Sequence, residues 1–204
     1  MECDKLKSVV SRLEKVADKL ESISVKHDSN QETTEMVDEF SRILQGPVAQ
    51  FVELSSNISP DVCEASKIMR TGFTLTLEFL KVVSASKKPS DQQLMELLKP
   101  LTSCIEEIQA FSKKCFKSDY KTHIGAISEF STCFQWVVAP GKPHLFIEST
   151  IESGIYYSNR VISSFKDKQG SADHKIWVQS LNKCFEELKE YCKNYHVMGI
   201  SWNV

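Results

Sequence analysis

The residues with the greatest capacity for catalysis or metal binding are five histidines and seven cysteines, scattered along the chain. The sequence contains no Cys-x-x-Cys, His-x-x-x-His or Glu-x-x-His pair, spacings that typically build zinc and redox sites. Cys133 and His123 lie almost three turns apart on one predicted helix, too far for contact along it. The seven glycines occur singly, so there is no glycine-rich phosphate loop. We therefore expect no enzyme and no cofactor, although distant helices could still assemble a site.

Composition indicates a folded globular protein. Apolar residues make up 41% of the chain and charged residues 25%, values that are ordinary for a globular domain. The net charge is −2 and the cations are spread along the chain, so we expect no nucleic-acid partner and interpret pairs such as Lys113-Lys114 as solvated helix ends. No apolar run reaches the ~18 residues of a membrane span, and no secretory signal is evident. The cysteines are odd in number and scattered along the chain, which favours reduced thiols in a cytoplasmic protein.

Apolar residues recur at helical spacing over most of the chain, which predicts an all-α fold. We divide the chain into a coiled-coil segment over 1–25, a flexible linker over 26–35 and a helical bundle over 36–204. The predicted bundle helices cover residues 36–44, a short segment from 47, 60–84, a segment that follows residue 90, 119–138, 145–165 and 173–196.

Helix boundaries in the bundle follow from capping residues and prolines. Gly46 is expected to end the first bundle helix and Pro47 to begin the next. Ser59 and Ser90 are expected to cap the two helices that follow them. An apolar stripe continues through Pro100, which predicts one kinked helix there.

The first helix, predicted over residues 4–24, has apolar residues spaced alternately three and four apart. They are Leu6, Val9, Leu13, Val16, Leu20 and Ile23. Leucine at each a position and a β-branched residue at each d position favour trimers or tetramers over dimers. A seam this short is marginal alone, so the helix could instead fold back on the bundle. The polar linker and the strict 3.5-residue period favour self-association.

The helix predicted over 145–165 combines an apolar face with a possible binding face. The apolar face comprises Ile147, Ile151, Gly154, Ile155, Ser158, Val161, Ile162 and Phe165. Tyr156 falls opposite this face, and Asn159 and Arg160 flank it. A tyrosine beside an arginine is typical of a binding hot spot, but a neighbouring helix or a dimer interface could also cover it. Lys142, in a proline-bounded loop, is a candidate contact for an acidic partner.

Several stretches together resemble one known family. Arg12-Leu13-Glu14 is followed seven residues later by Lys19-Leu20-Glu21, which resembles the paired Arg-Leu-Glu signature of the cyclase-associated proteins. Lys19 departs from it, because lysine lacks the guanidinium fork. The other similar stretches, in the family's order, are Phe40 to Val48, Trp136-Val137, Tyr156 to Val161, His174 with Trp177, and Tyr195-His196 leading to Gly199 and Trp202.

The resemblance implies the N-terminal half of such a protein, a six-helix up-down bundle behind an oligomerising helix. The chain is expected to be either a fragment or a short family member. The resemblance further implies that it binds actin and cofilin-decorated actin as a homo-oligomer, and that it promotes filament severing, depolymerisation and monomer recycling in the cytoplasm, at the cytoskeleton and cell cortex. An alternative is a non-catalytic scaffold that tethers adenylyl cyclase through Arg12, Leu13, Glu14, Lys19, Leu20 and Glu21.

Overall fold

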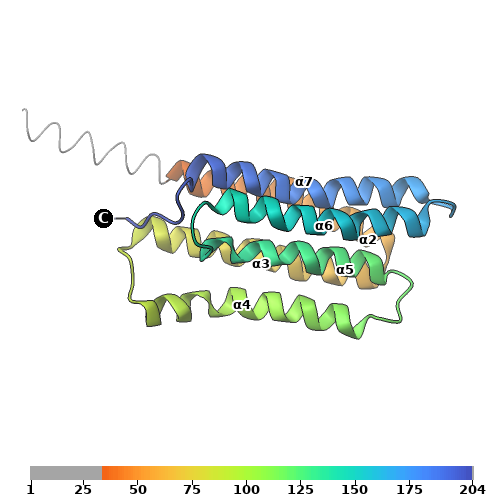
Figure 1. The fold of residues 1–204 in the computed structure, drawn as a ribbon, viewed down its shortest axis with the longest axis horizontal. Coiled ribbons are helices and arrows are strands. Elements are labelled where there is room, and N and C mark those ends of the chain that lie inside the picture. The colour runs from red at the N-terminus through yellow and green to blue at the C-terminus, as the bar shows by residue number, and fades with distance from the viewer. Residues whose placement is uncertain (1–33, 204) are drawn as a thin grey trace, which may run out of the picture. The chain divides into compact units, whose positions relative to one another are not determined.

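Long helices make up most of the part of the chain that the computed structural model describes, residues 34–203. They are α2 (Ala49–Ile58), α3 (Pro60–Ala85), α4 (Asp91–Lys114), α5 (Lys121–Phe130), α6 (Pro143–Phe165) and α7 (Ser171–Tyr195). These helices lie side by side along the bundle, as Figure 1 shows. Helix α6 packs between α5 and α7, and α3 packs against α2 and α4. No strand occurs within residues 34–203, so the predicted all-α, six-helix fold class is confirmed.

The N-terminal predictions fall largely outside this range. The seam over Leu6 to Ile23 lies outside the described residues, as does the linker up to residue 33. Residues 34 and 35, placed in the linker by the sequence, are already helical. The division into three segments stays a prediction.

The prediction that Gly46 ends a helix is wrong. Residues 34–43 are helical and continue through a π-helical turn, Leu44–Val48, directly into α2. Backbone angles stay helical on both sides, with φ −59° at Ile43 and φ −63° at Ala49. The wide π turn accommodates Pro47, whose ring would clash with a preceding carbonyl in a regular α-helix.

Side-chain hydroxyls set several helix ends. The Ser59 hydroxyl accepts a hydrogen bond from the Val62 amide at 3.1 Å, and Ser90 forms a capping box with Gln93. Both predicted caps are therefore confirmed, and α4 runs unbroken through Pro100.

The helix predicted over 119–138 is only partly correct. Helix α5 ends at Phe130, and a 3₁₀ helix follows over Ser131–Val137. The hydroxyl of Ser131 donates to the Ile127 carbonyl at 2.8 Å, and that of Thr132 donates to the Glu129 carbonyl at 2.7 Å. Hydroxyls that bond to nearby carbonyls compete with regular α-helical bonding, which is consistent with the tighter winding here.

A cluster of phenylalanine rings forms the centre of the core. The Phe73 ring of α3 lies 5.0 Å from the ring of Phe134 and 5.5 Å from the ring of Phe185, centroid to centroid. Phe130 of α5 stacks on Phe185 of α7 at 4.9 Å. All four rings are fully buried, so they join α3, α5 and α7 through one set of contacts.

Two helical glycines make room for this cluster. A Cβ atom at Gly154 would lie 2.5 Å from the Phe130 ring, and a Cβ atom at Gly72 would overlap the Phe134 ring. Atoms in a packed core cannot move aside cheaply, so these positions require glycine.

Two histidines that are far apart in sequence meet inside the bundle. His123 Nε2 of α5 lies 3.0 Å from His174 Nδ1 of α7, and Trp177 packs beside them with its ring 4.7 Å from that of His123. This pair was not predicted from the sequence, because nothing in the spacing of the two histidines brings α5 and α7 together. The Trp177 indole N–H donates to the Ser55 hydroxyl of α2 at 2.8 Å, so buried polar side chains of α2, α5 and α7 lie close together in the core.

Burial keeps these histidines neutral. Burial, followed by the neighbouring His174, lowers the pKa of His123 to about 3. Burial also lowers the pKa of His174 and that of His196, the latter to about 4. His196 and Tyr191 are also buried, and His196 Nε2 forms a hydrogen bond with the Tyr191 hydroxyl at 3.1 Å.

Enlarging either glycine should destabilise the fold. We expect Gly72→Ala and Gly154→Ala each to lower the free energy of unfolding by about 1–3 kcal/mol, because the added methyl overpacks the ring cluster. Gly125→Ala is the matched control in α5, where the nearest atom, on Tyr157, would be 3.9 Å away. It should be neutral or stabilise by up to about 1 kcal/mol through helix propensity. Equal losses of stability at all three positions in urea denaturation would contradict this packing account.

Acid should destabilise the bundle through its buried histidines. Below pH 6.5, the usual pKa of histidine, the histidines of the unfolded chain bind protons. His123 in the folded protein stays neutral until about pH 3. Stability is therefore lost as the pH falls, by up to about 1.4 kcal/mol per pH unit for each such histidine. Urea denaturation between about pH 7 and pH 5 measures this slope. His123→Leu should have a shallower slope than the wild type, and an unchanged slope would show that His123 does not carry the effect.

Candidate functional site

The outer face of α6 carries the predicted binding residues. Pro143 begins the helix, and its buried side comprises Ile147, Ile151, Gly154, Ser158, Val161 and Phe165. Tyr156 is 63% exposed, and Asn159 and Arg160 are also exposed, so all three lie on the side away from the core. Ile155 is 39% exposed, and its assignment to the apolar face is wrong. It lies about 100° around the helix from both Gly154 and Tyr156, at the boundary between the two faces.

Packing of the next residue fixes the direction of Tyr156. Tyr157 is half-buried and lies against Gly125 of α5, while its ring meets that of Tyr156 edge to face at 5.6 Å. Because consecutive helical residues point about 100° apart, this contact turns Tyr156 outward. Neighbouring helices within residues 34–203 leave most of its ring uncovered. Whether a partner or a second copy covers this face stays a prediction.

Charged side chains on α6 and α7 are unequally engaged in ion pairs. On α7, Lys189 lies 2.6 Å from the Glu186 carboxylate and 4.0 Å from Glu148 of α6. The hydrogen bond to Glu186 raises the pKa of Lys189. Within the described part of the chain, no ion pair involves Arg160, so its guanidinium is available to an acidic group of a partner.

Lys142 does not join this group. Its backbone carbonyl accepts hydrogen bonds from Leu145 and Phe146 at the start of α6, and its side chain is exposed. Lys142 and Tyr156 are fourteen residues apart. At 1.5 Å per residue, this places them about 20 Å apart along the helix. The four predicted residues therefore form one group of three and one separate cation.

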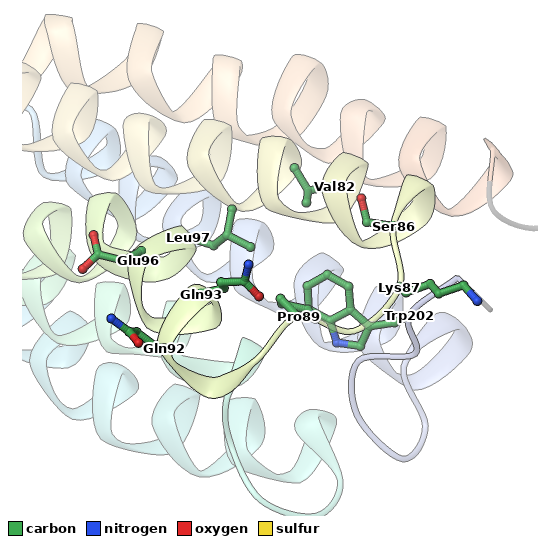
Figure 2. A pocket seen from close by; sticks show the side chains of 9 residues that line it. All are labelled: Val82, Ser86, Lys87, Pro89, Gln92, Gln93, Glu96, Leu97 and Trp202. Atoms are coloured by element: carbon green, nitrogen blue, oxygen red, sulfur yellow. The ribbon is translucent and has the colours of Figure 1, made fainter.

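A groove between α3 and α4 was missed by the sequence analysis. It has a volume of about 560 Å³ and is lined by Val82, Ser86, Lys87, Pro89, Gln92, Gln93, Glu96, Leu97 and Trp202 (Figure 2). Trp202 reaches it from the C-terminal tail, where the Asn203 amide donates to the Val83 carbonyl at 3.2 Å and the Trp202 ring meets Phe79 edge to face. The sequence contains no pattern that places residue 202 beside residue 82.

One polar side chain of the groove is already engaged in the fold. The Gln93 side-chain oxygen already accepts from the Ser90 amide at 3.0 Å, as part of the helix cap. The polar side chains that line the groove are Ser86, Lys87, Gln92, Gln93 and Glu96, and no histidine or cysteine is among them.

Four of the six described cysteines lie in the core, and Cys63 and Cys115 are half-buried. Burial raises the pKa of the Cys104 thiol to about 11, and burial also raises the pKa of Cys133, Cys184 and Cys192. These thiols are therefore protonated and unreactive at neutral pH. No group of three or more potential metal ligands occurs among residues 34–203. In the same range, no helix is both long and apolar enough to cross a membrane.

Comparison with known proteins identifies the domain. The family model "CAP, N-terminal domain" matches residues 40–200. Adenylyl cyclase-associated protein 1 of Bos taurus is 30% identical over 207 residues, which cover 97% of this chain and 43% of that protein. Adenylyl cyclase-associated protein 2 of Homo sapiens is 27% identical with the same coverage of both chains. The chain thus spans less than half the length of these relatives.

Solved structures show the same fold. The N-terminal domain of the adenylyl cyclase-associated protein from Dictyostelium discoideum superposes with a TM-score of 0.77 at 29% identity, over 82% of this chain and 94% of that one. A second N-terminal domain of CAP, described as showing variable oligomerisation, gives 0.78 at 28% identity, over 83% and 90%. The family is non-catalytic, in agreement with the prediction that the chain is not an enzyme. The chain therefore belongs to the cyclase-associated protein family and corresponds to its N-terminal helical domain.

Proposed function

We propose that this chain regulates the actin cytoskeleton by binding actin and cofilin-decorated actin as an oligomer, and that it promotes filament severing, depolymerisation and monomer recycling. Membership of the family supports a role in actin regulation in general. The structural observation that carries the proposal is the exposed group Tyr156, Asn159 and Arg160 on α6. We further propose that the protein acts in the cytoplasm, at the cytoskeleton and cell cortex.

The chemistry of the α6 group suits a protein partner. Tyrosine and arginine bury large areas and contribute most at interface hot spots. Because α6 packs against both α5 and α7, its outer side chains start from a rigid backbone. A rigid surface loses little conformational entropy on binding, which favours affinity.

Single-filament microscopy tests the proposed activity. Fluorescent actin filaments decorated with cofilin are followed with and without the full chain. We expect more severing events and faster shortening when the chain is present. Unchanged filament lifetimes, with a chain shown to be folded and oligomeric, would contradict the proposal.

Removal of the α6 side chains should weaken this activity without unfolding the bundle. Tyr156→Ala with Arg160→Ala is expected to reduce severing about tenfold or more, because two hot-spot residues typically contribute at least 1–2 kcal/mol together. Both side chains are exposed, so thermal stability should stay close to that of the wild type. The readout is the severing rate together with the thermal unfolding midpoint.

The matched control is Lys183→Ala with Glu187→Ala, an exposed pair with the same spacing on α7. It should retain full severing. If both double variants lose activity equally, the effect does not belong to the α6 face. If the α6 variant severs normally, actin binds elsewhere.

Self-association is proposed to reside in the N-terminal seam, outside the described residues. Leu13→Asp with Leu20→Asp places charge at two seam positions and should convert the oligomer to a monomer with the bundle still folded. Analytical ultracentrifugation measures the oligomeric state, and circular dichroism reports the helices. A double variant that still sediments as an oligomer would assign self-association to the bundle.

The alternative function is a scaffold that tethers adenylyl cyclase through the N-terminal helix. The motif residues Arg12 to Glu14 and Lys19 to Glu21, together with the name of the relatives, favour it. It is tested by co-precipitation of adenylyl cyclase with the wild type and with Arg12→Ala. Retention that depends on Arg12, combined with no effect on filaments, would favour the scaffold over the actin regulator.

A further inference from the structure

Two loops that are distant in sequence form one end of the bundle. The α4–α5 connection covers residues 115–120 and the α6–α7 connection covers residues 166–170. Tyr120 of the first loop stacks on Phe165, the last residue of α6, with ring centroids 5.7 Å apart. Figure 1 shows both connections at the same end, opposite the end that holds the α3–α4 connection.

This end carries most of its charge as exposed lysines. The seven lysines of residues 113–121 and 166–175 are all exposed, and they are Lys113, Lys114, Lys117, Lys121, Lys166, Lys168 and Lys175. The same two segments hold three aspartates, Asp119, Asp167 and Asp173, so their net charge is +4. The whole chain has a net charge of −2, so positive charge is concentrated here.

Acidic groups from α3 do not cancel this charge. Asp61 accepts a hydrogen bond from the Ser118 hydroxyl at 2.8 Å, which ties the α4–α5 loop to the start of α3. Glu64 lies 3.8 Å from Lys67, so that carboxylate is matched by a lysine of its own helix. With Asp61 included, the end of the bundle remains positive by three charges.

An aromatic side chain projects from the middle of the lysines. Phe116 is 63% exposed, and Lys117 Nζ lies 5.4 Å from the centre of its ring. Lys113 and Lys114 precede it in the last turn of α4. Exposure of a phenylalanine loses the free energy that burial would supply, so its position among cations points to a partner that offers both negative charge and an apolar layer.

We propose that this lysine-rich end of the bundle binds the surface of an anionic phospholipid bilayer, with Phe116 inserted at the boundary between headgroups and acyl chains. Lysines attract anionic headgroups, and an adjacent aromatic side chain reaches the apolar region below them. The two loops meet the membrane end-on, which leaves the outer face of α6 free to bind a protein.

The side-chain chemistry favours a bilayer over an acidic protein surface. All seven cations are lysines, which act as compact point charges, whereas arginine is preferred where a carboxylate is recognised in a fixed bidentate geometry. A mobile layer of headgroups requires no fixed geometry. The seven lysines are spread over both loops and the helix ends beside them rather than gathered around one cavity, which suits an extended charged surface.

Cosedimentation of the full chain with lipid vesicles tests the proposal. Vesicles of phosphatidylcholine mixed with phosphatidylserine should bind the chain, vesicles of pure phosphatidylcholine should not, and added salt should weaken binding. Lys113→Glu with Lys114→Glu should reduce the partition coefficient by about 25-fold or more, because each lysine near an anionic surface contributes roughly fivefold. Phe116→Ser, which keeps every charge, should reduce it by about tenfold.

The matched control is Lys87→Glu with Lys88→Glu, an exposed lysine pair at the opposite end that makes the same change in net charge. It should bind as the wild type does, with circular dichroism confirming that each variant is folded. Equal losses in the two pairs, or a wild-type chain that does not bind anionic vesicles at low salt, would overturn the proposal. Competition by soluble glycerophosphoserine would also overturn it, because that result indicates a pocket for a free headgroup rather than a bilayer surface.

Discussion

Gly72 of α3 and Gly154 of α6 face phenylalanine rings at distances that leave no space for a Cβ atom. These two contacts let Phe134 and Phe130 reach the centre of the bundle, where both lie within 6.2 Å of the Phe185 ring. Ring packing of this kind is sensitive to one added methyl group, because interiors are packed as densely as organic crystals. The distances at which α3, α5, α6 and α7 pack therefore depend on glycine, which has no side chain, at positions 72 and 154.

This close packing determines what the surface can present. With α6 held against α5, Tyr157 lies in the space beside Gly125 and Tyr156 points outward. The histidines with lowered pKa and most described thiols are enclosed in the core and are unavailable for chemistry at neutral pH. The features left to interact with other molecules are exposed helix faces and loop ends, as expected for a protein that works by binding.

Local signals in the sequence were sufficient for much of the fold. Ser59 and Ser90 cap the predicted helices, and the apolar stripe through Pro100 correctly indicated one helix. The continuous helix through Pro47 was not predictable from local rules, because a π turn resolves a clash that normally ends a helix.

Features that depend on distant residues were also missed. The helical wheel placed Tyr156, Asn159 and Arg160 outside correctly but failed at the boundary residue Ile155. The His123–His174 pair, the Trp202 groove and the lysine-rich end each join residues far apart in sequence. No spacing rule reveals them, because they arise only when the helices are packed.

Hydroxyl-radical footprinting of the chain bound to cofilin-decorated actin tests most directly whether the outer face of α6 makes the contact with the filament. Radicals oxidise exposed aromatic and sulfur side chains, and Tyr156, Phe116 and Met198 are 63%, 63% and 77% exposed. The account predicts that binding protects Tyr156 strongly while Phe116 and Met198, at the bundle ends, stay reactive. Unchanged oxidation of Tyr156, with protection at Met95 or Trp202 instead, would contradict it and move the contact to the α3–α4 side of the molecule.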